Sequence, residues 1–82
     1  MINMEQKILQ TLLMCIEKHP EESDNKKWFI RLIQNSLSSN NDPEIDIDFI
    51  HNITVIKSIL ANKDGFLKYL VYKISQITYV FF

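Results

Sequence analysis

The sequence predicts an all-α protein, a small antiparallel four-helix bundle that forms a single domain over residues 1–82. Apolar residues recur at intervals of three and four in four separate segments, which is the spacing of one buried helix face. Polar stretches that contain proline, asparagine or glycine separate these segments and predict the connections. A chain of 82 residues has room for one hydrophobic core. The predicted helices cover about 2–18, 22–38, 43–61 and 65–80.

The first predicted helix, over residues 2–18, has one apolar face. The residues of this face are Ile2, Leu9, Leu12, Leu13 and Ile16, with Ile8 at its edge. Glu5 and most other polar residues fall on the opposite side. His19 and Pro20 end the helix, because the residue before a proline avoids the α region.

The second predicted helix, over residues 22–38, has two alternative starts. Pro20 suits a first helical turn, especially with two glutamates after it, while Ser23 or Asp24 suits an N-cap. The apolar stripe of this helix consists of Trp28, Phe29, Leu32, Ile33 and Leu37. Lysine, arginine and amide side chains occupy the remaining positions, as expected for a helix with one buried face.

The third predicted helix, over residues 43–61, is apolar around more than half of its circumference. Asp42, Pro43 and Glu44 have the residue types of an N-cap and the two positions after it. The apolar residues are Ile45, Ile47, Phe49, Ile50, Ile53, Val55, Ile56, Ile59 and Leu60. Such a helix is typically central, with neighbours on two sides. Asn62 is expected to end it in the left-handed conformation.

The stretch from Phe66 to Phe82 is the most apolar part of the chain, with twelve apolar residues among seventeen. The other helices are expected to cover it, because water disfavours so large an apolar surface. Asp64 suits an N-cap and Gly65 a tight reversal before it. In a helix, the shared apolar face consists of Phe66, Leu67, Leu70, Val71, Ile74, Ile77 and Phe81. The last nine residues also have high β propensity but alternate poorly, so a helix that frays or turns near Thr78 is preferred to a strand.

Composition argues against several classes of protein. The net charge is −1, and residues 1–50 carry nine acids against five bases, so no nucleic-acid partner is expected. Cys15 is the single cysteine, which excludes an intrachain disulfide and fits a reducing cytoplasm. Charges at Glu5 and Lys7 argue against an export signal. The charged and polar residues within 66–82 argue against a membrane span.

No pattern of catalytic or metal-binding residues emerges. The acids from Asp42 to Asp48 resemble a calcium loop, but Ile47 and Ile53 stand where an EF-hand needs glycine and glutamate. Cys15 and His19 have the spacing of a chelating pair but lack further ligands. Neither a nucleophile motif nor a glycine-rich phosphate loop is present in the sequence. The sequence therefore predicts a protein that is not an enzyme and uses no metal or cofactor.

Surfaces remain as the candidate functional features. Two acidic clusters are candidate partner-binding residues. One lies at the connection between the first and second predicted helices and consists of Glu21, Glu22 and Asp24. The other lies before and within the third helix and consists of Asp42, Glu44, Asp46 and Asp48. They would attract a basic protein partner, although solvated caps have the same composition. A candidate homodimer interface consists of Tyr69, Tyr72, Tyr79, Phe81 and Phe82.

The order of these features resembles the small cytoplasmic helical immunity proteins that protect bacteria from bacteriocins or toxins. The shared features are the amphipathic first helix, a second helix centred on Lys27-Trp28-Phe29 and Leu32, and two more helices joined at Asp64-Gly65-Phe66. The apolar C-terminal stretch departs from the charged tails of that group. The resemblance implies binding and neutralisation of a toxin without catalysis. The alternatives are a homodimeric structural or regulatory subunit, and a phage or plasmid regulator that binds a host enzyme.

Overall fold

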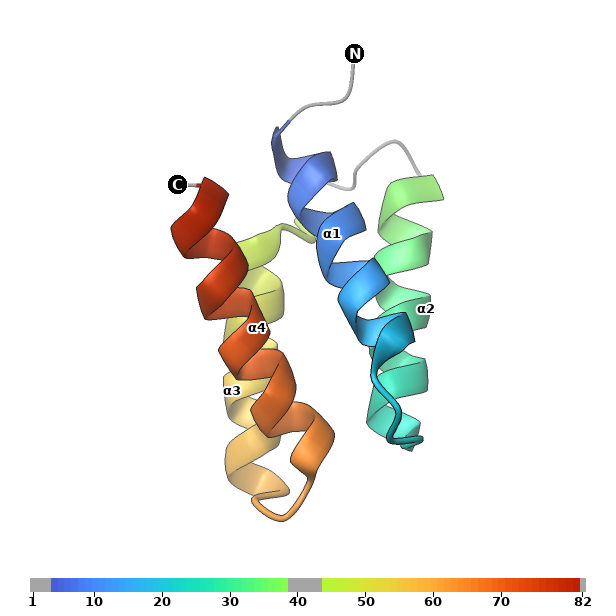
Figure 1. Ribbon diagram of the computed structural model, residues 1–82, viewed down its shortest axis with the longest axis vertical. Coiled ribbons are helices and arrows are strands. Elements are labelled where there is room, and N and C mark those ends of the chain that lie inside the picture. Colours follow the sequence, from blue (N-terminus) through green and yellow to red (C-terminus); the bar gives the residue numbers. More distant parts are fainter. Residues whose placement is uncertain (1–3, 39–43, 82) are drawn as a thin grey trace.

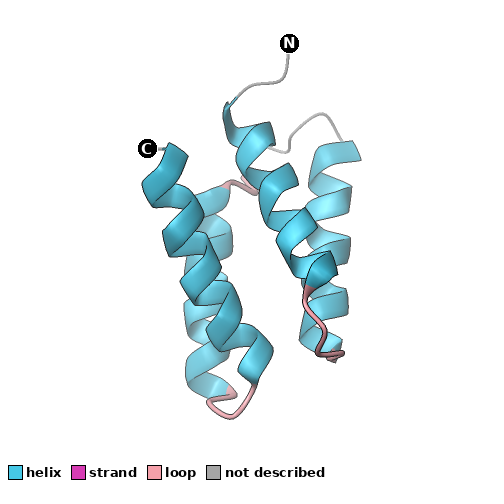
Figure 2. Ribbon diagram, viewed as in Figure 1, coloured by secondary structure: helices cyan, strands magenta, loops and turns pink. Residues whose placement is uncertain are grey.

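The computed structural model describes residues 4–38 and 44–81, apart from the side chain of Phe81. These residues form the helices α1 (Met4–Lys18), α2 (Asp24–Ser38), α3 (Ile47–Leu60) and α4 (Gly65–Phe81). Figure 2 shows no strand among them, so the predicted all-α four-helix bundle is confirmed. In Figure 1 the chain runs down α1, up α2, down α3 and up α4, which places the α1–α2 and α3–α4 turns at the same end.

The centre of the bundle is formed by α1 and α4. The helix α1 packs against both α2 and α4, and α4 also packs against α3, whereas α2 and α3 have no backbone contact with each other (Figure 1). The expectation that the third helix is central is therefore wrong. The physical reason is that α3 contributes only three buried residues, namely Ile47, Ile50 and Thr54.

Most of the predicted apolar faces of the first and last helices are confirmed as the core, whereas Leu13 and Val71 are half-buried, and Ile2 and the side chain of Phe81 lie outside the described structure. The buried apolar residues of α1 are Ile8, Leu9, Leu12 and Ile16, and those of α4 are Phe66, Leu67, Leu70, Ile74 and Ile77. Phe29 and Ile33 of α2 complete the core together with the two isoleucines of α3. The apolar face of the C-terminal stretch is thus covered, and the strand alternative for it is wrong.

The start of α3 differs from its prediction. The N-cap is Asp46, whose side chain accepts a hydrogen bond of 2.8 Å from the Phe49 N–H. Glu5 of α1 accepts a second bond, from the Ile47 N–H, so one helix caps another. Glu44 lies before the helix, whereas Asp42 and Pro43 are outside the described residues.

The turns at the other end follow their predictions more closely. Ser23 caps α2 by accepting from the Lys26 N–H at 3.0 Å, which decides between its two predicted starts. Asp64 caps α4 by accepting from the N–H groups of Phe66 and Leu67. The C-cap of α3 is Ala61 rather than Asn62.

The helix α4 runs to Phe81 without a break at Thr78. The Thr78 hydroxyl donates to the Ile74 carbonyl oxygen at 2.7 Å, within the helix itself. The expected fraying near Thr78 is therefore wrong. No helix of the described residues has the length and apolar character that crossing a membrane requires.

Candidate functional site

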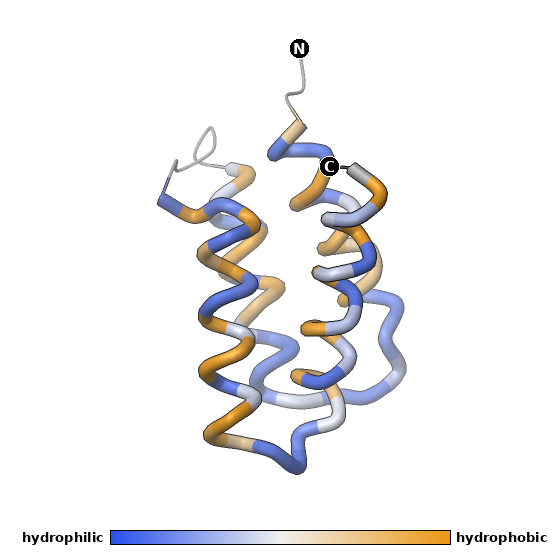
Figure 3. Tube along the Cα trace, turned by 90° about the vertical axis from the view of Figure 1, so that its left-hand side faces the viewer, coloured by the Kyte–Doolittle hydropathy of each residue, from blue (hydrophilic) through white to orange (hydrophobic). Residues whose placement is uncertain are grey.

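A row of exposed apolar side chains follows α3. We call Phe49, Ile56 and Leu60 the α3 apolar flank, because their spacing of seven and four places them along one side of the helix. Their exposed fractions are 41%, 52% and 82%. Ile59 lies farther round the helix and is 71% exposed. Hydrophobic segments recur along the whole of α3 in Figure 3, so this helix has more apolar surface than the core uses.

The flank is exposed because α2 and α3 do not touch through their backbones. One side-chain contact links them: the Lys57 ammonium of α3 lies 4.4 Å from the centre of the Trp28 ring of α2. Trp28 remains 38% exposed. The predicted core stripe of α2 is therefore wrong at Trp28, which lies at the border of the bundle beside α3.

A groove of about 560 Å³ runs between the beginning of α3 and the end of α4. Its lining residues are Ile47, Asp48 and His51 of α3, and Ile74, Ser75, Thr78 and Tyr79 of α4. Because Ile47 and Ile74 are buried while Asp48 and Tyr79 are exposed, the groove has an apolar floor and a polar rim. Its volume lies within the roughly 300–1,000 Å³ of typical ligand sites.

Two groups on the polar rim of the groove, Asp48 and Thr78, can act only as hydrogen-bond acceptors, whereas His51, Ser75 and Tyr79 can also donate. The Asp48 carboxylate has no ion pair or hydrogen bond with any other described residue. The Thr78 hydroxyl has already donated its proton to the Ile74 carbonyl, so it presents only lone pairs to a further partner. Neither lysine nor arginine is among the lining residues. This arrangement favours a ligand that donates hydrogen bonds and carries positive charge.

The two acidic clusters predicted as partner-binding residues do not form one surface. Glu21, Glu22 and Asp24 lie at the end with the short turns, whereas Asp46 and Asp48 lie at the beginning of α3 (Figure 1). The longest dimension of the molecule is 39 Å, several times the screening length of about 8–10 Å in physiological salt. Asp42 is outside the described residues, and Glu44 is exposed.

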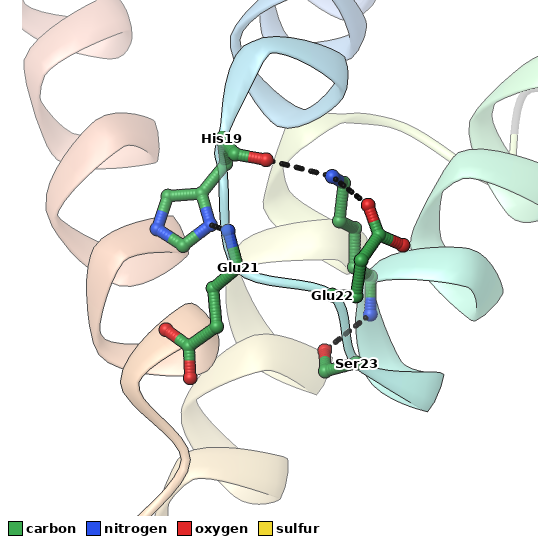
Figure 4. A network of polar contacts seen from close by, with 5 residues as sticks. His19, Glu21, Glu22 and Ser23 are labelled. Carbon is green, nitrogen blue, oxygen red and sulfur yellow. Dashed lines mark hydrogen bonds and ion pairs between the residues drawn. The ribbon is translucent and has the colours of Figure 1, made fainter.

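Several of these acids are engaged in the fold. Glu22 forms an ion pair of 3.1 Å with Lys26, whose side chain is only 7% exposed (Figure 4). The same ammonium donates to the His19 carbonyl oxygen at 2.7 Å. A carboxylate oxygen of Glu21 would lie 3.0 Å from a Cβ added to Gly65, which places it beside the first turn of α4. Asp46 is the N-cap of α3, and Asp48 is a described acid of the α3 cluster that is exposed and has no bond to another described residue.

His19 lies in the connection that follows α1, and its ring packs against α4. Its ring centre lies 4.3 Å from that of Tyr69 and 5.6 Å from that of Phe66. Its Nδ1 accepts a hydrogen bond of 3.3 Å from the Glu21 N–H (Figure 4). Among the described residues, no group of three or more histidine, cysteine or acidic side chains is placed to hold a metal ion.

Tyr69 belongs to the contact between α1 and α4. Its hydroxyl donates to the Cys15 carbonyl oxygen at 3.3 Å, and the side chain is half-buried. Burial, and then the nearby Cys15 thiol, raises the pKa of the Tyr69 hydroxyl above its ordinary value of about 10. Tyr69 is therefore a poor member of the predicted dimer interface.

Two other members of that interface, Tyr72 and Tyr79, lie on the outer side of α4. Tyr72 and Tyr79 are 62% and 88% exposed and are seven residues apart, so they share one side of the helix. Val80, which the prediction did not include, is 72% exposed. The side chain of Phe81 and all of Phe82 are outside the described structure.

Sequence reasoning missed the α3 apolar flank and the groove. The signal for the flank was present, because the predicted third helix had more apolar positions than one buried face needs. It was interpreted as a sign of a central helix. The groove had no sequence signal, since its two sides come from residues about 27 positions apart, such as Asp48 and Ser75. Comparisons with protein-family models, curated proteins and solved structures found no match to this chain.

Proposed function

We propose that this protein acts without catalysis by binding another protein, in the manner of an immunity or inhibitor protein that neutralises a toxin or a host enzyme. The α3 apolar flank is the observation that carries the proposal. Leu60 keeps most of its surface in water, and Ile56 keeps about half. A partner surface that covered them would remove the free-energy cost of this hydration. Small proteins rarely expose such a row of large apolar side chains along one helix without a use for it.

The surroundings of the flank support the same interpretation. Trp28 of α2 contacts Lys57, the residue after Ile56 in α3, and tryptophan is one of the residue types that contribute most to protein interfaces. The Lys57 ammonium lies 4.4 Å from the centre of the Trp28 ring, and this cation–π contact favours one position of the exposed aromatic surface. A helix face with an aromatic neighbour matches the mode in which partners dock against apolar helix surfaces.

Capture of partners from the host lysate tests this proposal when matched variants are compared. Leu60→Lys places a charge on the flank, and Met14→Lys places the same charge on α1, where Met14 is 56% exposed. Both positions are exposed, so each change is expected to alter the free energy of unfolding by less than about 0.5 kcal/mol. We expect the wild type and Met14→Lys to retain a distinct protein that Leu60→Lys loses. Retention by all three proteins would contradict a role for the flank.

A homodimeric subunit is the second candidate, and the exposure of Tyr72 and Tyr79 on one side of α4 favours it. Sedimentation equilibrium distinguishes the two candidates. A dimer that Tyr72→Lys dissociates and Leu60→Lys preserves would support the α4 interface. A monomer at all accessible concentrations would exclude it.

A further inference from the structure

We propose that the groove between α3 and α4 is a binding site for an arginine side chain of the protein partner. This inference rests on the proposed function, because it takes the ligand to be part of another protein. The groove lies on a different side of α3 from the α3 apolar flank, so it would add a second, polar contact to the same helix.

The first argument is charge. Asp48 is exposed at the rim and is not neutralised by any described residue, and the lining contains neither lysine nor arginine, its basic residue being His51. Lys73, on α4, donates to Gln76 at 3.1 Å and lies over the Tyr69 ring, so it is directed toward the α1 side. The groove therefore attracts a cation and would disfavour a carboxylate or phosphate.

The second argument is hydrogen bonding. A guanidinium has five N–H donors and no acceptor, so it needs a site rich in acceptors. The Asp48 carboxylate supplies two oxygens. The Thr78 hydroxyl can only accept, since its proton is already donated to the Ile74 carbonyl oxygen. The Ser75 hydroxyl on the same rim adds another oxygen. The planar fork of a guanidinium pairs with a carboxylate through two parallel bonds.

The third argument is shape. An arginine carries an aliphatic stem below its charged group, and such stems lie along apolar surfaces while the charge stays in water. The floor formed by Ile47 and Ile74 accommodates the stem, and the exposed Tyr79 ring offers a face on which the guanidinium can stack. A metal ion or a compact ammonium group would leave the apolar floor unused.

The test is a titration of the ¹⁵N-labelled protein with the methylamide of N-acetylarginine, followed by NMR. The methylamide of N-acetylcitrulline serves as comparator, since it has nearly the same shape without the charge. We expect amide shifts confined to the beginning of α3 and the end of α4, with the arginine probe alone. Asp48→Asn is expected to weaken this binding about three- to tenfold, in keeping with the loss of a charge-assisted pair.

The matched control is Glu17→Gln, which removes one exposed negative charge from the last turn of α1, at the end of the bundle away from the groove. It is expected to leave the titration unchanged. Equal weakening by both variants, or equal binding of the citrulline probe, would overturn the proposal, as would the absence of shifts at the groove. Such a failure is distinct from failure of the proposed function, because the lysate capture depends on Leu60 and does not require Asp48.

Discussion

Lys26 shows how a charged residue becomes part of the core of a small bundle. Its ammonium has two partners within the first turn, the His19 carbonyl and the Glu22 carboxylate, and its stem is buried beneath them. A buried charge is tolerated only when it is paired and hydrogen-bonded. The acidic turn therefore has a structural use, which weakens its earlier interpretation as a binding surface.

Replacing Lys26 with methionine tests this role. The change keeps a stem of similar length but leaves the His19 carbonyl oxygen without its donor, so we expect a loss of about 1–2 kcal/mol in the free energy of unfolding. Lys27→Met, at the exposed neighbouring position, should change it by less than about 0.5 kcal/mol. Urea denaturation of both variants measures the difference. Equal midpoints would contradict a structural role for Lys26.

Tyr69 predicts a pH dependence of stability. Because its pKa is raised in the folded state, its contribution is fully present below the unfolded value of about 10 and is lost as the pH rises above it. We expect the wild type to lose more stability than Tyr69→Phe between pH 9 and 11, a window set around that value of about 10. Denaturation at several pH values measures this loss. Parallel curves for the two proteins would show that Tyr69 titrates as it does in the unfolded chain.

At the scale of the element, the described starts of α2, α3 and α4 are held by groups from their own turns or from a neighbouring helix. The helix α3 illustrates both, since Asp46 caps it locally and Glu5 reaches it from α1. Asp64 likewise caps α4 and accepts a bond of 2.8 Å from the Asn25 side chain of α2. Such links join helices at their ends as well as through their apolar faces.

The two acids at the beginning of α3 are expected to differ in their effect on stability. Asp46→Ala removes the N-cap and should cost about 1 kcal/mol. Asp48→Ala removes an exposed carboxylate without a described partner and should change stability by less than about 0.5 kcal/mol. Thermal unfolding followed by circular dichroism distinguishes them. A larger effect at Asp48 would contradict the assignment of the cap.

At the scale of the molecule, α1 and α4 form the centre while α2 and α3 lie on either side. This order explains why α3 leaves four large apolar side chains exposed, namely Phe49, Ile56, Ile59 and Leu60. The helix α3 packs mainly against α4 and touches α1 less extensively, so one of its flanks remains in water. The proposed partner contacts follow from this position.

Two leucines on different helices test this arrangement. Leu12→Ala in α1 removes a fully buried side chain and should cost about 2–5 kcal/mol. Leu60→Ala in α3 removes one that is 82% exposed and should change stability by less than about 0.5 kcal/mol. Guanidinium denaturation of both variants gives the comparison. Similar costs would mean that the end of α3 is buried in solution.

The elements themselves followed from local patterns. The spacing of Leu9, Leu12 and Ile16 predicts the inner face of α1, and the residue type of Asp64 predicts the cap of α4. These predictions succeeded because a helix face and a cap depend on residues within one or two turns of each other. The same reasoning failed at Asn62, where the helix ends one residue earlier.

The arrangement of the helices depends on tertiary contacts that no local pattern contains. Periodicity predicts that α3 has apolar residues on two sides, but not which side finds a neighbour. That choice depends on how the four helices pack around a shared core, in which Phe29, Phe66 and Leu70 are fully buried. The α3 apolar flank and the groove beside Asp48 are consequences of that packing, and so only the tertiary structure reveals them.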